Sequence, residues 1–575
     1  MVPQPNRLAW QLAVTAAGVP ERGQRTDHYY IMLLDLPTNV WVESVQGSLS
    51  ACDLAALRGS SPKAEPLVEA ATARRLADHG IEGGRMVLGL SPAAACFLVE
   101  RHNHAQRVCI KVSAAMGTSA VVSSQGTAFV CGWCDLYGQL GLNLPHVTLV
   151  AGRYGSRRLH SDCPSQFTFA AVSTSHVRQL PRRLIAQDCH ERVDDAPIEN
   201  VVSASVGSFH TGIVLADGTL LTAGNNSSGE LGCYEEDGTP EVDSDPADIG
   251  VHNRAVFCPV SIGAPVAAVS AGLGHTLVLL RDGGVMSFGA NYSCQLGRPE
   301  LPKTTSWSGF PLGAVSLPTR AVQVIANSGS SRALLSNGKA LAWGNNSDAG
   351  LGIGVEDYNQ AADDPSDAFS TAFRDTPTPV IIDEPITKLA SKAAVTVSGK
   401  LFVWGSNDCG QLGLPVGEQV EGAFRPDRIL TPTVVPAPFI VDVDTSSKFI
   451  VALASNGELL TAGDDRSSQL SRALGPMAHE FDEQEDFPNC PQKGWCDPQL
   501  GAVQRAAGSS SARAVAVAAG DYHAVVMLDD GSVLTWGGQT ADGFEEHPST
   551  GTDCSVLGRG VDAPGQAASV QLGAV

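Results

Sequence analysis

Short apolar runs recur along the chain, and each pair of runs flanks a turn that contains glycine. The clearest copy, His210 to Gly232, reads HTGIVLADGTLLTAGNNSSGELG. It holds an apolar run, Asp-Gly, a second apolar run, a glycine, a polar stretch and Leu-Gly. Asp-Gly and Asn-Gly pairs supply the positive backbone angles of tight hairpin turns. Each copy is therefore predicted to form a β-hairpin.

The pattern occurs seven times. The turn glycines are Gly126, Gly218, Gly283, Gly338, Gly399, Gly457 and Gly531. A second glycine follows six residues later in every copy: Gly132, Gly224, Gly289, Gly344, Gly405, Gly463 and Gly537. A glycine at the end of a strand indicates a bulge or a close backbone approach. Repeats on this scale are typical of propellers, solenoids or arrays.

The spacing between copies leaves room for more than a hairpin. Successive second glycines are 55 to 92 residues apart, which is enough for another pair of strands and a loop. A lone hairpin is marginally stable, and radial closure is the usual solution for short-stranded repeats. A leucine that follows each second glycine is expected to anchor the loop in the core. These leucines are Leu231, Leu296, Leu351, Leu412 and Leu470, with Leu140 in the first copy and Phe544 at this place in the last.

This pattern resembles the regulator of chromosome condensation family of seven-bladed β-propellers. The repeat of that family runs roughly Gly-x-x-His-Thr, Asp-Gly, Trp-Gly and Gly-Gln-Leu-Gly. Residues 207–211 and 272–276 carry the first element, and residues 138–141 and 410–413 carry the last. The resemblance covers about residues 110–550. It implies an all-β fold, a seven-bladed β-propeller, which in this chain carries long insertions between its blades.

The histidine of the repeat occurs in three copies, as His210, His275 and His523. We interpret it as a hydrogen-bonded core residue that orients a loop, rather than as a catalytic or metal-binding group. Thr118, Ser330 and Phe449 stand at the equivalent spacing elsewhere, and the copy around Lys392 is shortened.

Two regions are predicted. Residues 1–105 form a small N-terminal α+β extension, either a cap or a source of strands for the propeller. Residues 106–575 form the propeller itself, and residues 568–575 are a candidate closing strand. Long insertions are expected near residues 143–200, 233–258, 354–385 and 473–512.

The insertions supply the candidate partner-binding residues, because loops on one face of a rigid repeat scaffold usually form binding surfaces. The residues are Arg157, Arg158, Arg182 and Arg183 in the first insertion, Glu235, Glu236 and Asp237 in the second, and Asp482, Glu483 and Glu485 in the fourth. All four insertions follow the Leu-Gly element, so they are expected on the same rim. The alternative is that they are solvated acidic loops.

The composition restricts partners and compartment. A net charge of −22 and a pI near 5.0 disfavour binding to nucleic acid. No apolar run approaches membrane-spanning length. Fourteen cysteines without a framework, and no signal-peptide core, indicate a reducing compartment. We therefore expect a cytoplasmic protein, with a cytoskeletal or ciliary assembly as one setting and the nucleus or mitochondrion as alternatives.

No motif in the sequence predicts active-site chemistry. Cys131 and Cys134 form a Cys-x-x-Cys motif, but Gly132 between them belongs to the repeat, so we interpret them as ordinary propeller cysteines. Cys490 and Cys496 alone are too few for structural zinc. No metal, cofactor or catalytic residue is predicted.

Three functions remain open. The first is a non-enzymatic interaction scaffold that binds other proteins of a larger assembly. The second, which the resemblance suggests, is guanine-nucleotide exchange on a small GTPase. The third is an RNA or organelle-assembly role through the arginines of the first insertion.

Overall fold

The structure is a computed structural model that describes ten stretches of the chain. They are residues 111–132, 137–142, 166–173, 197–233, 253–302, 309–354, 373–415, 428–472, 496–538 and 565–572, with short breaks at 116, 466–467, 507–508 and 571. The chain divides into two compact units, Met1–Val108 and Cys109–Val575. The predicted N-terminal extension, 1–105, lies outside the described residues.

The described residues form 28 strands in seven sheets of four. Blade 1 holds β1 (Lys111–Ala114), β2 (Thr118–Val122), β3 (Ala128–Gly132) and β4 (Gln166–Ala171). Blade 2 holds β5 (Val201–Val206), β6 (His210–Leu215), β7 (Leu220–Gly224) and β8 (Arg254–Val260). Blade 3 holds β9 (Val266–Ala271), β10 (His275–Leu280), β11 (Val285–Ala290) and β12 (Gly309–Val315). Blade 4 holds β13 (Ala321–Ala326), β14 (Ser330–Leu335), β15 (Ala340–Asn345) and β16 (Phe373–Pro379).

The remaining blades follow the same order. Blade 5 holds β17 (Ile386–Leu389), β18 (Ala393–Thr396), β19 (Leu401–Ser406) and β20 (Arg428–Val435). Blade 6 holds β21 (Ile440–Thr445), β22 (Phe449–Ala454), β23 (Leu459–Asp464) and β24 (Cys496–Ala502). Blade 7 holds β25 (Ala514–Ala519), β26 (His523–Leu528), β27 (Val533–Gly537) and β28 (Gly565–Val570).

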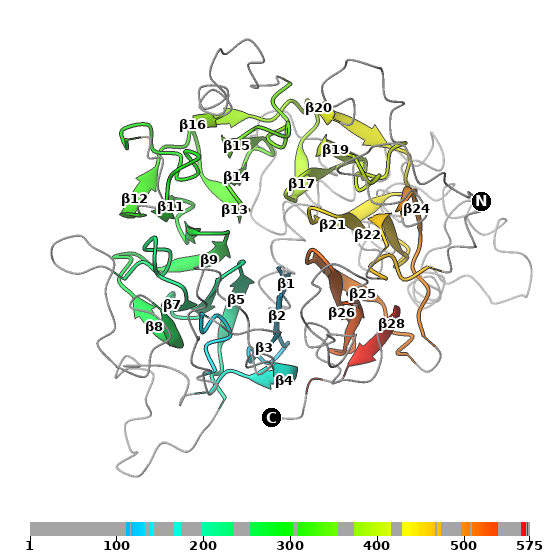
Figure 1. Ribbon diagram of the computed structural model, residues 1–575, viewed down its shortest axis with the longest axis horizontal. Helices are drawn as coiled ribbons and strands as arrows, with labels where there is room; N and C mark the ends of the chain where they lie inside the picture. Colours follow the sequence, from blue (N-terminus) through cyan, green and yellow to red (C-terminus); the bar gives the residue numbers. More distant parts are fainter. Residues whose placement is uncertain are drawn as a thin grey trace, which may run out of the picture. The chain divides into compact units, whose positions relative to one another are not determined.

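The seven sheets form a closed ring in which each blade comes from consecutive strands of the chain (Figure 1). All described neighbours within a sheet pair antiparallel, as in β5–β6 and β6–β7. The first strand of each blade lies at the centre, and the ring closes where β1 contacts β25 and β26. The C-terminal strand β28 is the outer strand of blade 7, so the predicted closing strand begins at Gly565 and completes that blade's own sheet.

The paired glycines have the structural roles that their spacing predicts. All seven turn glycines have positive φ, and so do all the second glycines except Gly132. The third and fourth strands of each blade shift register just before the second glycine, as between Ser287 and Gly289. An added Cβ on Gly289 would lie 2.6 Å from the carbonyl oxygen of Gly274. Glycine is required there both for the backbone angle and for the close approach.

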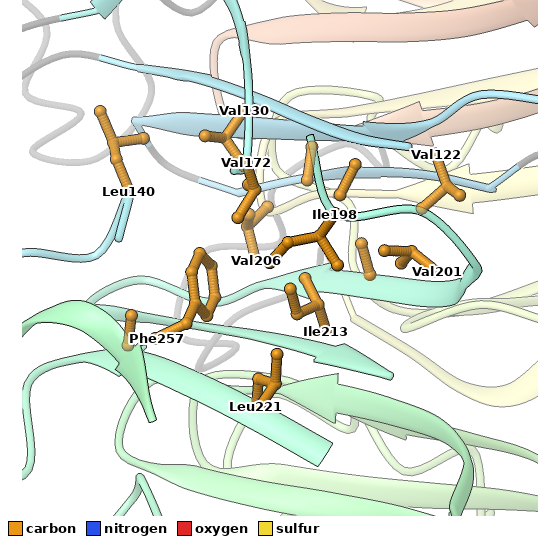
Figure 2. Close-up of a cluster of buried hydrophobic side chains, with 14 of the residues drawn as sticks. Val122, Val130, Leu140, Val172, Ile198, Val201, Val206, Ile213, Leu221 and Phe257 are labelled. Atoms are coloured by element: carbon orange, nitrogen blue, oxygen red, sulfur yellow. The ribbon is translucent and has the colours of Figure 1, made fainter. Parts of the chain in front are cut away.

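The hydrophobic core lies mainly between neighbouring blades. Figure 2 shows one cluster, in which Val122 and Val130 of blade 1 face Ile213 and Phe257 of blade 2. The loop leucines of the repeat are at most 1% exposed: Leu140, Leu231, Leu296, Leu351, Leu412 and Leu470. This placement confirms their predicted role as anchors, and Phe544 lies outside the described residues.

Four outer strands, β12, β16, β20 and β24, are more exposed than the other strands of their blades, and five outer strands contain proline. The prolines are Pro259 in β8, Pro311 in β12, Pro377 and Pro379 in β16, Pro432 in β20 and Pro498 in β24. Proline cannot donate to a further strand, so these edges are protected against pairing with another chain.

The predicted insertions differ from the structure because each contains an outer strand. The stretch near 143–200 contains β4, 233–258 contains most of β8, 354–385 contains β16, and 473–512 contains β24. The outer strands β16 and β24 lack the apolar runs of the other strands of their blades, so their sequences resemble loops. The first insertion is therefore two segments, one before β4 and one after it.

Candidate interaction face

The two ends of the propeller carry different connections. Because the strands of a blade alternate in direction, the turn from first to second strand and the connection from third to fourth strand lie at one end. We call this end the loop face. The opposite end carries the hairpin turns with glycine and the links to the next blade, and we call it the turn face.

A hydrogen-bonded relay beneath the loop face joins blade 2 to blade 3. His210 Nε2 lies 2.8 Å from Thr276 Oγ1, which donates to the carbonyl oxygen of Glu230 at 2.6 Å. Since the hydroxyl proton goes to that carbonyl, the imidazole donates from Nε2 and is neutral. Burial lowers the pKa of His210 to about 3. The histidine at the start of β6 is thus connected, through Thr276 of blade 3, to the loop that contains Glu230 in its own blade 2.

The other two repeat histidines occupy the same place. His275 lies 2.9 Å from Ser331 Oγ in blade 4, and that hydroxyl donates to the carbonyl oxygen of Gln295 at 2.7 Å. His523 lies 2.7 Å from Ser119 Oγ and so links blade 7 to blade 1 where the ring closes. Each ring is fully buried, and burial lowers the pKa of both histidines to about 3.

In blades 1, 2, 3 and 5 the residue before the loop leucine braces the loop with its side chain. Gln139, Gln295 and Gln411 each accept a hydrogen bond at Oε1 from the backbone N–H two residues earlier. Glu230 replaces glutamine in blade 2 and accepts from Ser228 N at 2.7 Å. Burial raises the pKa of Glu230 to about 8, so its carboxyl group is protonated at neutral pH.

Tryptophan indoles complete the contacts between blades. Trp343 Nε1 donates to the carbonyl oxygen of Gln295 at 3.0 Å. Trp404 donates to Gly350 at 2.8 Å, and Trp536 donates to Gln469 at 2.7 Å. The backbone under the loop face is therefore held by the neighbouring blade as well as by its own, which makes it a rigid base for the loops above it.

Blade 5 departs from this scheme. Only four residues separate the cross-strand partners Leu389 and Ala394, whereas eight separate their equivalents Val269 and Val278 in blade 3. The sequence predicted this shortened copy. Two residues are missing from each strand, so the hairpin ends about 7 Å short of the corresponding hairpin in blade 3.

Charged side chains lie at the shortened hairpin of blade 5. Lys392 Nζ lies 2.6 Å from Asp348 Oδ2 of blade 4. The buried guanidinium of Arg332 donates to Ser330 Oγ and to the carbonyl oxygen of Gly350. Burial alone would raise the pKa of Asp348, but Lys392 and Arg332 lower it below its ordinary value.

Partly exposed aromatic side chains lie on the loop face of blades 7, 1 and 2. Phe209 and Tyr522 occupy the same position in the first turns of blades 2 and 7. Tyr137 of blade 1 packs edge-on against Phe209, with ring centroids 5.0 Å apart. Aromatic residues of this kind, half-buried on a rigid base, are enriched among those that dominate protein interfaces.

The sequence-predicted binding residues lie outside the described residues, but their anchors are defined. Arg157 and Arg158 fall in 143–165, and the described residues on both sides of this segment lie at the loop face. Arg182 and Arg183 fall in 174–196, after β4, where both anchors lie on the turn face. The expectation that the first insertion emerges on a single rim was wrong, because β4 separates the two arginine pairs.

The segments that contain the acidic candidates, in contrast, are all anchored at one face. Five third-to-fourth-strand segments, 234–252, 355–372, 416–427, 473–495 and 539–564, are anchored at the loop face. Together they contain 25 of the 60 acidic residues of the chain and three of its 38 basic residues. This excess of 22 acids equals the net charge of the whole chain, so the remaining residues are balanced in charge.

Metal-binding clusters and membrane-spanning helices are absent from the described stretches. No group of three or more His, Cys, Asp or Glu side chains there could hold a metal ion. No helix in the same stretches is long and apolar enough to cross a membrane. Cys131 is buried, and its burial raises the pKa of its thiol well above the ordinary value.

Comparison with known proteins identifies the repeats. The fold itself defines the protein as a seven-bladed β-propeller. Models of the regulator of chromosome condensation repeat match parts of four blades: one matches residues 266–295 and 514–541, and a second matches residues 398–453. These matches fall on blade 3, blades 5 and 6, and blade 7.

Several known proteins share the repeat. The chain is 25% identical to the mouse Secretion-regulating guanine nucleotide exchange factor over 375 residues, 62% of this chain and 71% of that protein. It is 26% identical to the human Probable E3 ubiquitin-protein ligase HERC6 over 305 residues, 52% of this chain but only 26% of the ligase. The crystal structure of Prp20p from Saccharomyces cerevisiae has a TM-score of 0.52 at 15% identity, covering 82% of this chain and 89% of that one. This structural likeness is one of fold.

Proposed function

We propose that this protein is a non-enzymatic interaction scaffold that binds partner proteins through the loop face. The observation that carries the proposal is the separation of charge: the acidic excess of the chain is confined to segments anchored at that face. Such a field attracts basic protein surfaces and accelerates their association.

The rigid base under the loops supports this function. The histidine relays and the indole hydrogen bonds hold the loop bases of blades 2, 3, 4 and 6 against the next blade, so little ordering is required there on binding. The aromatic groups Phe209, Tyr137 and Tyr522 offer apolar anchors beside the charged segments. A partner would thus be attracted by charge and held by a small apolar contact.

Guanine-nucleotide exchange is the second candidate. It is favoured by the similarity to a protein named as an exchange factor, which extends over 71% of that protein. A small GTPase with a basic surface would fit the same loop face, so one experiment addresses both candidates.

The test is gentle affinity purification of the tagged full chain, with partners identified by mass spectrometry. One variant removes three charges from the loop face by Glu235→Gln, Glu236→Gln and Asp237→Asn. The matched control removes three from the turn face, at Glu199, Asp383 and Glu458, all of which are exposed.

The scaffold proposal predicts a stoichiometric set of proteins that is weakened by the loop-face variant and by added salt, and kept by the turn-face control. Equal retention by both variants would contradict it. A single small GTPase, bound without nucleotide and released by GTP, would instead establish exchange.

A further inference from the structure

Two cysteines from neighbouring blades meet at the loop face. Cys409 lies in the turn after β19 in blade 5, and Cys496 begins β24 in blade 6. Their side chains are hydrogen-bonded to each other, and both are reduced. Cys409 is 3% exposed, whereas Cys496 is half-buried.

The geometry of the repeat brings these two positions together. At the equivalent junction of blades 2 and 3, Gly309 begins β12, and an added Cβ there would lie 1.7 Å from the carbonyl oxygen of Ser228. Ser228 holds the place of Cys409, four residues after the second glycine. Beside the cysteines, an added Cβ on Gly410 would lie 2.5 Å from the Cα of Pro498. The fourth strand of one blade therefore packs closely against the third-to-fourth-strand loop of the preceding blade.

The surroundings of the pair suit thiol chemistry. The backbone N–H of Cys409 donates to Gln411 Oε1 at 2.8 Å, which fixes its turn. The hydrogen bond from Cys496 lowers the pKa of the Cys409 thiol, and Lys448 acts in the same direction against burial and the nearby carboxylates of Asp408 and Asp464. The reactive thiolate form is thereby favoured in one member of the pair.

We propose that Cys409 and Cys496 form a reversible dithiol–disulfide switch that hydrogen peroxide closes. The accessible Cys496 sulfur attacks one peroxide oxygen as its proton leaves, the O–O bond breaks, and a sulfenic acid and hydroxide form. The Cys409 thiolate then attacks the sulfenic sulfur, the S–O bond breaks, and the S–S bond forms as a second hydroxide leaves. The two thiol protons convert both hydroxides to water, so two thiols reduce one peroxide to two waters.

The disulfide would join blade 5 to the outer strand of blade 6 on the loop face. It closes a long stretch of chain, and such crosslinks stabilise a protein by restricting its unfolded state. A redox-sensitive pair is also the kind of disulfide that occurs in a reducing compartment.

The test uses the full chain, treated with hydrogen peroxide, alkylated, digested without reductant and examined by mass spectrometry. We expect a peptide pair joined through Cys409 and Cys496 that disappears with dithiothreitol. Cys409→Ser and Cys496→Ser should abolish it. Cys409→Ser should fold, since Ser228 and Ser293 occupy this place in blades 2 and 3. Cys233→Ser, which removes a half-buried thiol elsewhere on the loop face, should keep the crosslink.

The same samples provide a second measurement. The oxidised wild type should unfold at a higher denaturant concentration than the reduced protein, and Cys409→Ser should show no such shift. Oxidation of Cys496 to a sulfinic acid with Cys409 still reduced would overturn the proposal. A different disulfide partner for either cysteine, or a crosslink that forms only in denaturant, would also overturn it.

Discussion

Glu230 should make the propeller less stable as the pH rises. It replaces the glutamine of the repeat, is 1% exposed, and makes the same backbone hydrogen bond as Gln295 in blade 3. Glu230→Gln keeps the shape and the acceptor oxygen but removes the ionisable group. The variant should therefore be more stable than the wild type, increasingly so at higher pH.

The magnitude follows from the raised pKa. In the unfolded chain the carboxyl group ionises near its ordinary pKa of 4.5, whereas burial raises the folded-state pKa to about 8. The folded state thus binds more protons between these values, so the stability is present below pH 4.5 and is lost as the pH rises towards 8. At about 1.4 kcal/mol per pKa unit, the wild type should lose roughly 3 kcal/mol relative to Glu230→Gln between pH 5 and pH 8.

The assay is urea unfolding of both proteins at pH 5, 6.5 and 8. Subtracting the two curves at each pH cancels the titration of every other group. Gln295→Glu is the reciprocal variant, since it places a carboxyl group in the equivalent loop of blade 3 and should create the same pH dependence. Parallel pH profiles for wild type and Glu230→Gln would refute the reasoning, because the carboxyl group would then not be buried in its neutral form.

Three further predictions concern the contacts between blades, and urea unfolding measures each. Gly289→Ala should destabilise the protein by more than about 2 kcal/mol, whereas Gly263→Ala, with positive φ but open space around it, should cost only about 1 kcal/mol; equal losses would contradict the steric argument. His523→Asn should cost about 1–2 kcal/mol at pH 7 through the lost bond to Ser119. The wild type should lose roughly 3 kcal/mol between pH 7 and pH 4 through this group, because the folded-state pKa of His523, about 3, lies below the ordinary 6.5. His523→Asn should not show this loss, and a variant with the same acid profile as the wild type would refute the argument. Trp536→Phe should cost about 1–2 kcal/mol, and no loss would mean that its indole bond to Gln469 does not contribute.

The fold was predictable because the informative positions are local. Turn glycines, apolar runs and loop leucines each specify one hairpin within about 25 residues, and their sevenfold recurrence predicts closure. The outer strands were not predictable in the same way. β16, with the sequence FRDTPTP, has neither alternation nor an apolar run, and its two prolines suggest a loop. Its strand conformation is imposed by pairing with β15, which the sequence alone does not reveal.

The site was less predictable because it depends on contacts between blades. The three histidines are visible in the sequence, but their partners Thr276, Ser331 and Ser119 belong to other repeats. Cys496 was considered only with Cys490, its neighbour in sequence, whereas its contact is Cys409 in the preceding blade. Aligning the repeats matches Cys409 with Ser228 and Cys496 with Gly309, but only the structure shows that these two positions touch.

Differences among the blades are largest in their loops rather than in the buried framework. A sevenfold repeat needs the same brace in each blade for stability, and the buried glycines and leucines vary little. The loop face varies instead: Phe209 and Tyr522 stand where blade 3 has Gly274, and blade 5 lacks four residues of its first hairpin. The third-to-fourth-strand segments vary most, from the basic residues of 143–165 to the acidic residues of 234–252. Closure of the ring requires none of this variation, whereas a surface that recognises an asymmetric protein partner, as proposed for the loop face, would need it.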